Sequence, residues 1–234
     1  MSLSRDRILA IQAEKLATLL ATVADTNPFY RRKLAAASAS ELAETTVDRL
    51  VELPFTTKDD LVRDQRDNPP YGTNLSYPLD CYVRLHNTTG TTGRPLRWLD
   101  TSSSWSWFVE CWRQILEEAG VRADDRVFLA FSFGPFIGFW GAFEAAQKIG
   151  ALTLTGGALS TEQRLEQLFE NRATVLVSTP TYALRLAEVA RHRGIDLASS
   201  DIRLTIHAGE PGASVPNVKL RIEESWGATC IDHA

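Results

Sequence analysis

Two kinds of hydrophobic spacing divide the chain. In the N-terminal third, apolar residues recur at helical spacing between Leu9 and Val23, and Asn27-Pro28 ends that run. From Cys81 onward, short apolar runs alternate with longer amphipathic segments. We therefore expect a helical and irregular segment over residues 1–80 and an α/β region over residues 81–234.

The short apolar runs predict strands, and the amphipathic segments between them predict helices. Candidate strands cover 82–86, 96–99, 126–131, 152–155, 174–178, 203–207 and 229–232. Candidate helical faces cover 105–116, 138–149, 161–169 and 182–189, and a short charged helix is expected after Thr56 or Thr57. Strands that alternate with helices of this length imply βαβ units, so the expected fold is a mostly parallel sheet with flanking helices.

An uncharged run over residues 127–143 raises the alternative of a membrane segment. It is shorter than the roughly 20 residues that a spanning helix needs, and Gly134-Pro135 interrupts it. A buried strand followed by a buried helix is therefore favoured, and no membrane partner is expected.

Composition narrows the class further. Hydrophobic residues make up 44% and charged residues 23% of the 234 residues, which is typical of a packed soluble domain. A net charge of −4 argues against nucleic acid as a partner. The three cysteines form no CxxC pair, and residues 2–23 contain no continuous apolar core of a signal peptide. A reducing compartment, the cytoplasm, is expected.

Residues 84–95 read Arg-Leu-His-Asn-Thr-Thr-Gly-Thr-Thr-Gly-Arg-Pro, a composition that suits an anion-binding loop. Glycines let backbone N–H groups approach an anion, hydroxyls add donors, and an arginine adds a fixed charge. The residues concerned are Thr88, Thr89, Gly90, Thr91, Thr92, Gly93 and Arg94. The loop lacks the Gly-Lys-Ser/Thr ending of a Walker motif. Taken alone, it fits a flexible polar turn equally well.

The positions of the other loops favour the phosphate-binding interpretation. Open parallel sheets bind ligands beyond the carboxyl ends of their strands. The loops expected at that edge are 87–94, 132–138, 156–157, 179–180 and 208–212, and four of the five contain glycine. We expect a large, flat ligand there.

With these loops aligned, the chain resembles the phenylacetate–CoA ligase family of adenylate-forming enzymes. Residues 84–95 are similar to that family's Arg-Ile-His-Ala-Ser-Ser-Gly-Thr-Thr-Gly-Lys-Pro run. Further similar motifs are Pro-Phe-Tyr-Arg-Arg at 28–32, Leu-Pro-Phe-Thr-Thr-Lys-Asp-Asp-Leu at 53–61, Thr-Pro-Thr-Tyr at 179–182 and Gly-Glu-Pro at 209–211. Together they cover essentially the whole chain, as the N-terminal portion of such an enzyme.

The resemblance implies an AMP-forming ligase that uses ATP, Mg²⁺ and coenzyme A. A carboxylate would attack the α-phosphate of ATP to give an acyl-adenylate, and coenzyme A would then displace AMP. The family's adenine-binding residues correspond to Gly209, Glu210, Pro211 and Asp232. From base rates of exposure alone, Glu210 would instead be an ordinary surface carboxylate.

The resemblance places the acyl pocket at Phe136, Gly138, Phe139 and Gly141. Aromatic walls suit an aromatic or similarly apolar acid, although aromatic residues at this spacing also form plain core. The family reads Thr-Gly-Gly-Leu-Gly where this chain reads Ile-Gly-Phe-Trp-Gly at 137–141. Phe139 adds a bulky ring, which puts phenylacetate itself in doubt.

In the family, a Mg²⁺-binding Glu, a ribose-binding Asp and a mobile lid with a catalytic Lys follow the segment that matches 231–234. Catalytic residues are therefore expected beyond Ala234, and no metal ligand is assigned within the chain. The chain alone is expected not to complete adenylation. Two alternatives stay open: loading of a carrier-protein thiol, and a truncated paralogue that binds a nucleotide or acyl ligand without catalysis. A homodimer is also left open.

Overall fold

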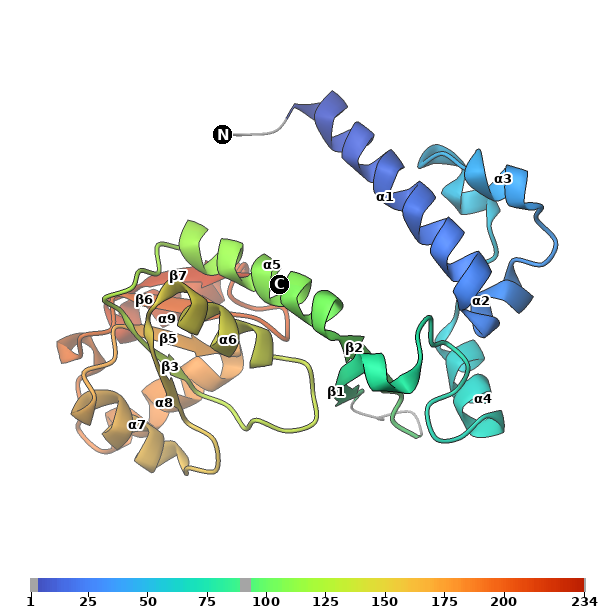
Figure 1. Cartoon of the computed structure of the whole chain (residues 1–234). Coiled ribbons are helices and arrows are strands. Elements are labelled where there is room, and N and C mark those ends of the chain that lie inside the picture. The colour runs from blue at the N-terminus through green and yellow to red at the C-terminus, as the bar shows by residue number, and fades with distance from the viewer. Residues whose placement is uncertain (1–3, 89–93, 234) are drawn as a thin grey trace. The chain divides into compact units, whose positions relative to one another are not determined.

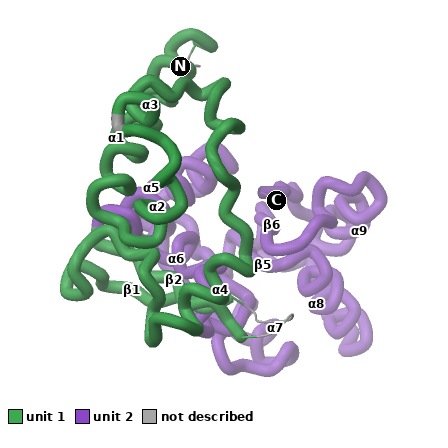
Figure 2. Tube along the Cα trace, turned by 90° about the vertical axis from the view of Figure 1, so that its right-hand side faces the viewer, with its two compact units in different colours: residues 1–102 green, residues 103–234 purple. Residues whose placement is uncertain are grey.

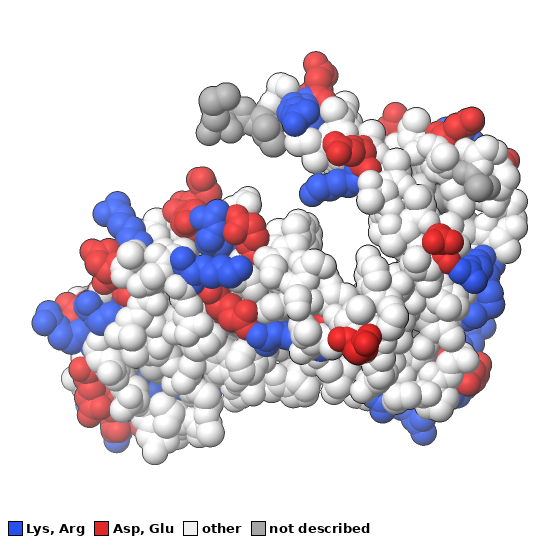
Figure 3. Space-filling model, in the orientation of Figure 1, with Lys and Arg blue, Asp and Glu red and all other residues white. Residues whose placement is uncertain are grey.

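The computed structural model describes residues 4–88 and 94–233. It divides the chain into two compact units, residues 1–102 and 103–234 (Figures 1 and 2). Among the described residues, no helix is long and apolar enough to cross a membrane. On the face drawn in Figure 3, acidic and basic side chains intermingle.

The first unit consists of short helices followed by a β-hairpin. Its elements are α1 (Arg5–Thr26), α2 (Pro28–Lys33), α3 (Ala39–Ala43), η1 (Asp48–Glu52), α4 (Lys58–Asp67), η2 (Leu79–Cys81), β1 (Tyr82–Asn87) and β2 (Arg97–Thr101). Asn27 separates α1 from α2, because its side chain accepts a hydrogen bond from the N–H of Tyr30 while Pro28 starts the new helix. Thr57 caps α4 in a capping box with Asp60.

A buried carboxylate ties α4 to the chain that follows it. Asp64 is 8% exposed and accepts hydrogen bonds from the N–H (2.5 Å) and hydroxyl (2.6 Å) of Thr73. Gln65 on the same helix exchanges two hydrogen bonds with the backbone of Arg97, the first residue of β2. The hairpin is therefore anchored to α4 by polar contacts.

The second unit is a parallel sheet with helices on both faces. Its elements are α5 (Ser102–Glu118, which begins at the boundary), β3 (Arg126–Leu129), α6 (Trp140–Ile149), β4 (Leu152–Thr155), α7 (Thr161–Glu170), β5 (Val175–Ser178), α8 (Pro180–His192), η3 (Leu197–Ser199), β6 (Leu204–His207), α9 (Pro216–Trp226) and β7 (Thr229–Asp232). The strand order is β4-β3-β5-β6-β7, and every neighbouring pair is parallel.

Alternate side chains of the strands build two cores, one on each face. Phe128, Leu176 and Cys230 pack under α7, α8 and α9, whereas Val127, Val177 and Ile206 pack under α5 and α6 (Figure 1). Nearly all of the strand residues of β3, β5 and β6 are buried. Such continuous burial is typical of a parallel sheet covered on both sides.

The predicted α/β class with a mostly parallel sheet is confirmed, with one correction to its first two strands. The sequence placed 82–86 and 96–99 at the start of the alternating α/β region, and the 87–94 loop at the carboxyl edge of its sheet. In the structure β1 and β2 form a separate antiparallel pair within the first unit. The hairpin bonds to itself and to α4, and the first compact unit extends to residue 102.

Candidate nucleotide and acyl site

Three polar residues form a row across the carboxyl ends of β5, β6 and β7. Ser178 pairs in register with His207, and His207 with Asp232. Register partners in a parallel sheet point to the same face. The Ser178 hydroxyl lies 3.4 Å from Nδ1 of His207, and both side chains are fully buried. The row forms a polar floor at the edge where the sequence placed the ligand.

His207 is held neutral in this position. Burial lowers the pKa of His207 from 6.5 to about 4, and this is only partly offset by hydrogen bonding to the backbone of Ser178 and by the charge of Asp232. Among the residues that the structure describes, Nε2 of His207 has no hydrogen-bond partner. His207 was not predicted as a site residue from the sequence, although a histidine that ends a buried strand was a visible signal.

The predicted adenine-binding loop is fixed to the start of α8. One carboxylate oxygen of Glu210 accepts hydrogen bonds from the N–H (2.9 Å) and the hydroxyl of Thr181, and these bonds lower the pKa of Glu210. Gly209 adopts φ +92°, a conformation that favours glycine. Glu210 is therefore neither a free surface carboxylate nor buried, and it stabilises the positive end of α8.

A buried arginine that was not predicted from the sequence joins two strand-end segments, those after β3 and β4. Arg164 on α7 is 7% exposed and donates hydrogen bonds to the carbonyl oxygens of Gly156 (2.8 Å), Gly157 (2.9 Å) and Ala130 (3.3 Å). Its guanidinium also lies 4.9 Å from the ring centroid of Tyr182 on α8. Within the described residues, no carboxylate lies within 4 Å of it, so carbonyl dipoles and a ring face solvate the charge.

The predicted acyl pocket lies in an aromatic cluster beyond β3. Phe139 stacks on Phe131 with ring centroids 3.7 Å apart, and Trp140 contacts Phe133 at 4.7 Å. The indole N–H of Trp140 donates to the carbonyl oxygen of Gly134 (3.1 Å), which fixes the loop between them. Phe139 is thus part of an aromatic cluster with the segment that follows β3.

The other predicted acyl residues have different surroundings. Phe136 is 45% exposed, and a Cβ added to Gly138 would meet no atom within 4 Å. At Gly141, by contrast, an added Cβ would lie 2.5 Å from Trp112 and 2.6 Å from Phe108. Gly141 therefore lets α6 approach α5 closely, which is a packing role.

The predicted phosphate-binding loop belongs to the first unit. Thr89, Gly90, Thr91, Thr92 and Gly93 lie outside the described residues. Thr88 exchanges hydrogen bonds with Leu96, through its N–H and through its hydroxyl, each at 3.0 Å. Arg94 and Leu96 line a cavity of 230 Å³ beside Gln65 on α4.

Comparison with known proteins gives a consistent result. No family model matches the chain. It is 30% identical over 229 residues to the phenylacetate-coenzyme A ligase of Pseudomonas putida and 30% identical over 234 residues to that of Escherichia coli (strain K12). These alignments cover 98% of this chain and 51% of each relative, so the chain spans about half the length of the curated relatives it matches.

A solved structure agrees with the sequence relatives. The crystal structure of 2-hydroxyisobutyryl-CoA ligase in complex with 2-HIB-AMP and CoA, in the thioesterification state, has a TM-score of 0.91 and 30% identity to this chain. The match covers 98% of this chain and 49% of that one. The predicted resemblance to phenylacetate–CoA ligases is confirmed.

Proposed function

We propose that this chain is part of an ATP-dependent acyl-CoA ligase that activates an apolar carboxylic acid. The observation that carries the proposal is similarity to CoA ligases over nearly the whole chain, in sequence and in fold. In the reaction, a carboxylate oxygen bonds to the α-phosphorus of ATP while pyrophosphate leaves. The thiolate of coenzyme A then bonds to the acyl carbon while AMP leaves.

The adenine of ATP would lie against the Gly209–Pro211 loop and Asp232. Asp232 ends β7 in register with His207. The carboxylate of Glu210 already accepts a hydrogen bond from Thr181. We assign Glu210 the task of shaping the loop, and Asp232 that of accepting hydrogen bonds from the purine amino group. Because His207 is neutral near pH 7, the floor beneath the base adds no positive charge.

The triphosphate would be held by the loop that begins at Thr88 and ends at Arg94. Preorganised donors stabilise the negative charge that develops during phosphoryl transfer. Arg94 would supply the fixed positive charge. The roles of residues 89–93 rest on the sequence motif alone.

An aromatic or similarly bulky apolar acid suits the cluster beyond β3. Phe136 is half exposed, and there is open space at Gly138, so both remain candidate wall residues. Phe139 would contribute one ring of the wall through its stack on Phe131. Gly141 would act indirectly by setting the distance between α6 and α5.

Adenylate-forming chemistry implies Mg²⁺, which would neutralise phosphate charge when bound. Among the described residues, no group of three or more His, Cys, Asp or Glu side chains is arranged to hold a metal ion. The residues that the structure describes do not supply a ligand set, and we assign no step to the metal.

Ligand binding by the chain provides the first test. Isothermal titration with a phenylacetyl sulfamoyl adenosine, a stable acyl-adenylate analogue, should give one saturable site. Asp232→Asn should weaken this binding about tenfold, since it removes a charged acceptor. Glu118→Gln, a change of an exposed carboxylate at the end of α5, is the matched control. Absence of saturable binding, or an equal loss of affinity in both variants, would contradict the assignment of the nucleotide to this site.

Catalysis is tested on the complete product of the reading frame that encodes these residues. Acid-dependent exchange of pyrophosphate into ATP reports adenylation, and mass spectrometry reports the thioester. Supplying coenzyme A or a carrier protein separates the two acceptors, and a panel of aryl, branched and linear acids defines the substrate. Parallel assays of the 234-residue chain test the expectation that it does not complete adenylation alone.

A further inference from the structure

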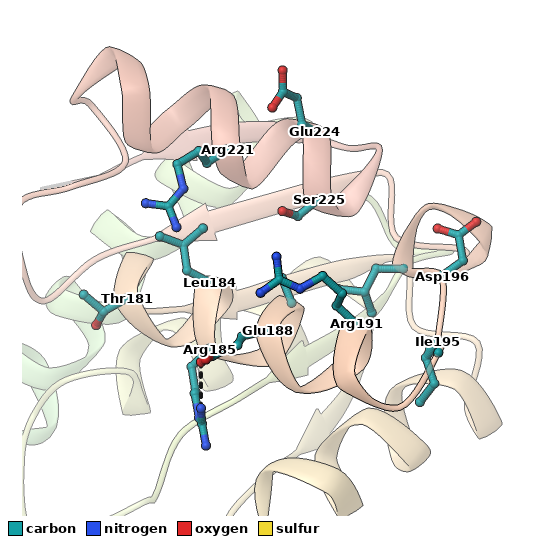
Figure 4. A pocket seen from close by; sticks show the side chains of 13 residues that line it. Thr181, Leu184, Arg185, Glu188, Arg191, Ile195, Asp196, Arg221, Glu224 and Ser225 are labelled. Carbon is teal, nitrogen blue, oxygen red and sulfur yellow. Dashed lines mark hydrogen bonds and ion pairs between the residues drawn. The ribbon is translucent and has the colours of Figure 1, made fainter.

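A second concave surface lies on the outer side of the parallel sheet unit, between α8, η3 and α9. Its volume is 920 Å³, within the range of small-molecule sites, and Figure 4 shows its side chains. Arg185, Glu188 and Arg191 come from α8, and Arg221 and Glu224 from α9. We refer to this surface as the α8–α9 groove.

Two arginines in the groove are available to a ligand. Arg185 is paired with Glu188 on its own helix at 2.6 Å (dashed line in Figure 4), so these two charges cancel. Arg191 and Arg221 make no ion pair or hydrogen bond with any residue that the structure describes. In Figure 4 both guanidinium groups extend into the space between the two helices.

Two further acids line the groove, and neither forms an ion pair with these arginines. The side chain of Glu224 points away from the groove in Figure 4. Asp196 accepts a hydrogen bond from the N–H of Ala198 (3.0 Å) and thereby caps η3. Arg191 and Arg221 are therefore the groove cations that form no ion pair with a described residue.

Between the arginines, the groove has an apolar floor. Leu184 and Ala187 on α8 are partly buried in the core, as is Ile195 beyond its end, and Leu197 is 3% exposed. A Ser225 side chain from α9 adds one hydroxyl at the wall. An apolar surface flanked by two arginines suits a ligand with a phosphate group and an apolar body.

We propose that the α8–α9 groove binds an organic phosphate, with the phosphate between Arg191 and Arg221 and the apolar body on the floor. Guanidinium groups match phosphate oxygens in planar, bidentate geometry. Neither arginine makes an ion pair or hydrogen bond with a described residue, so binding breaks no such contact among them. Residues 209–211 do not line the groove, although Thr181, which bonds to Glu210, does. The proposal does not depend on the proposed function.

The test uses 1-naphthyl phosphate as the probe and the complete 234-residue chain. Its binding is measured by calorimetry beside 1-naphthol and inorganic phosphate. The single variants Arg191→Gln and Arg221→Gln should each weaken binding at least about tenfold, since each removes a charge-assisted contact. Arg172→Gln is the matched control, because Arg172 is exposed and paired with Asp201 outside the groove. Thermal unfolding of each variant confirms folding.

Each outcome bears on the proposal. The proposal is supported if the aryl phosphate binds saturably and its affinity falls in both groove variants. The affinity should also weaken with salt and be unchanged in Arg172→Gln. Equal affinity for 1-naphthol would overturn the requirement for an anion, and equal affinity for inorganic phosphate would overturn the requirement for an apolar body. Binding that is unaffected by Arg191→Gln and Arg221→Gln, or absent at millimolar probe, would overturn the site.

Discussion

Titration of His207 should dominate the loss of stability of the second unit between pH 7 and pH 5. The side chain is fully buried, and burial lowers its pKa from 6.5 to about 4. In the unfolded chain, the imidazole binds a proton near pH 6.5, whereas in the folded chain it stays neutral until about pH 4. Stability is therefore fully present above pH 6.5 and is lost as the pH falls toward 4.

The size of the stability loss follows from the shift in the pKa of His207. The difference between the folded and unfolded pKa values corresponds to about 3 kcal/mol of unfolding free energy in total. About 2 kcal/mol of this is lost by pH 5. Asp232 and Ser178 face the imidazole from the neighbouring strands, and the charge of Asp232 already reduces the shift. The pKa of His207 therefore reflects burial, partly compensated by the charge of Asp232.

The measurement compares urea unfolding of the parent chain with that of His207→Gln and His207→Phe, followed by tryptophan fluorescence at several pH values. Five of the six tryptophans lie in the second unit, so the signal reports mainly on it. The carboxylates titrate in all three proteins and cancel in the difference. The parent should lose about 2 kcal/mol more than either variant between pH 7 and pH 5. Parallel pH dependence in the three proteins would refute the reasoning.

Four further substitutions probe the helices and loops around the sheet. Gly141→Ala places a methyl group against Trp112 and should destabilise the chain by about 1–3 kcal/mol in thermal unfolding, whereas Gly138→Ala, which meets no neighbour, should change it little. Glu210→Gln removes the charge at the start of α8 and should cost about 1 kcal/mol, measured by urea unfolding; no change would show the contact to be incidental. Arg164→Met removes three hydrogen bonds to carbonyl oxygens and should cost about 3 kcal/mol, and a loss below about 0.5 kcal/mol would contradict its clamping role.

Local hydrophobic patterns predicted the helices and strands well but did not predict which strands pair with one another. The strands at 152–155 and 229–232 were predicted with the bounds that the structure has. Strand pairing was harder, because an alternating run does not say which neighbour supplies its hydrogen bonds. For this reason β1 and β2 were assigned to the wrong sheet region. Helix α9 was not predicted at all, although Pro216 at its start and Gly227 after its end are typical boundary signals.

The site was less predictable than the fold, because its side chains act over long separations in sequence. Glu210 was selected through a motif, yet its partner Thr181 lies 29 residues earlier. Arg164 looked like one more charge on an amphipathic helix, and base rates place such a residue in solvent. Its burial depends on the carbonyl of Ala130, 34 residues away, which only the folded sheet brings within reach.

The contacts of these two residues tie the loops at the carboxyl edge of the sheet to one another and to α8. Arg164 joins the segments after β3 and β4, and Glu210 joins the loop after β6 to α8. A loop that is already ordered loses little conformational entropy on binding, so more of the contact energy appears as affinity. Arg164 donates to three backbone carbonyl oxygens, and Glu210 accepts from the backbone N–H and the hydroxyl of Thr181. A ligand at this edge would meet a surface whose shape is fixed by the fold, and changes to either residue should weaken binding mainly by loosening that surface.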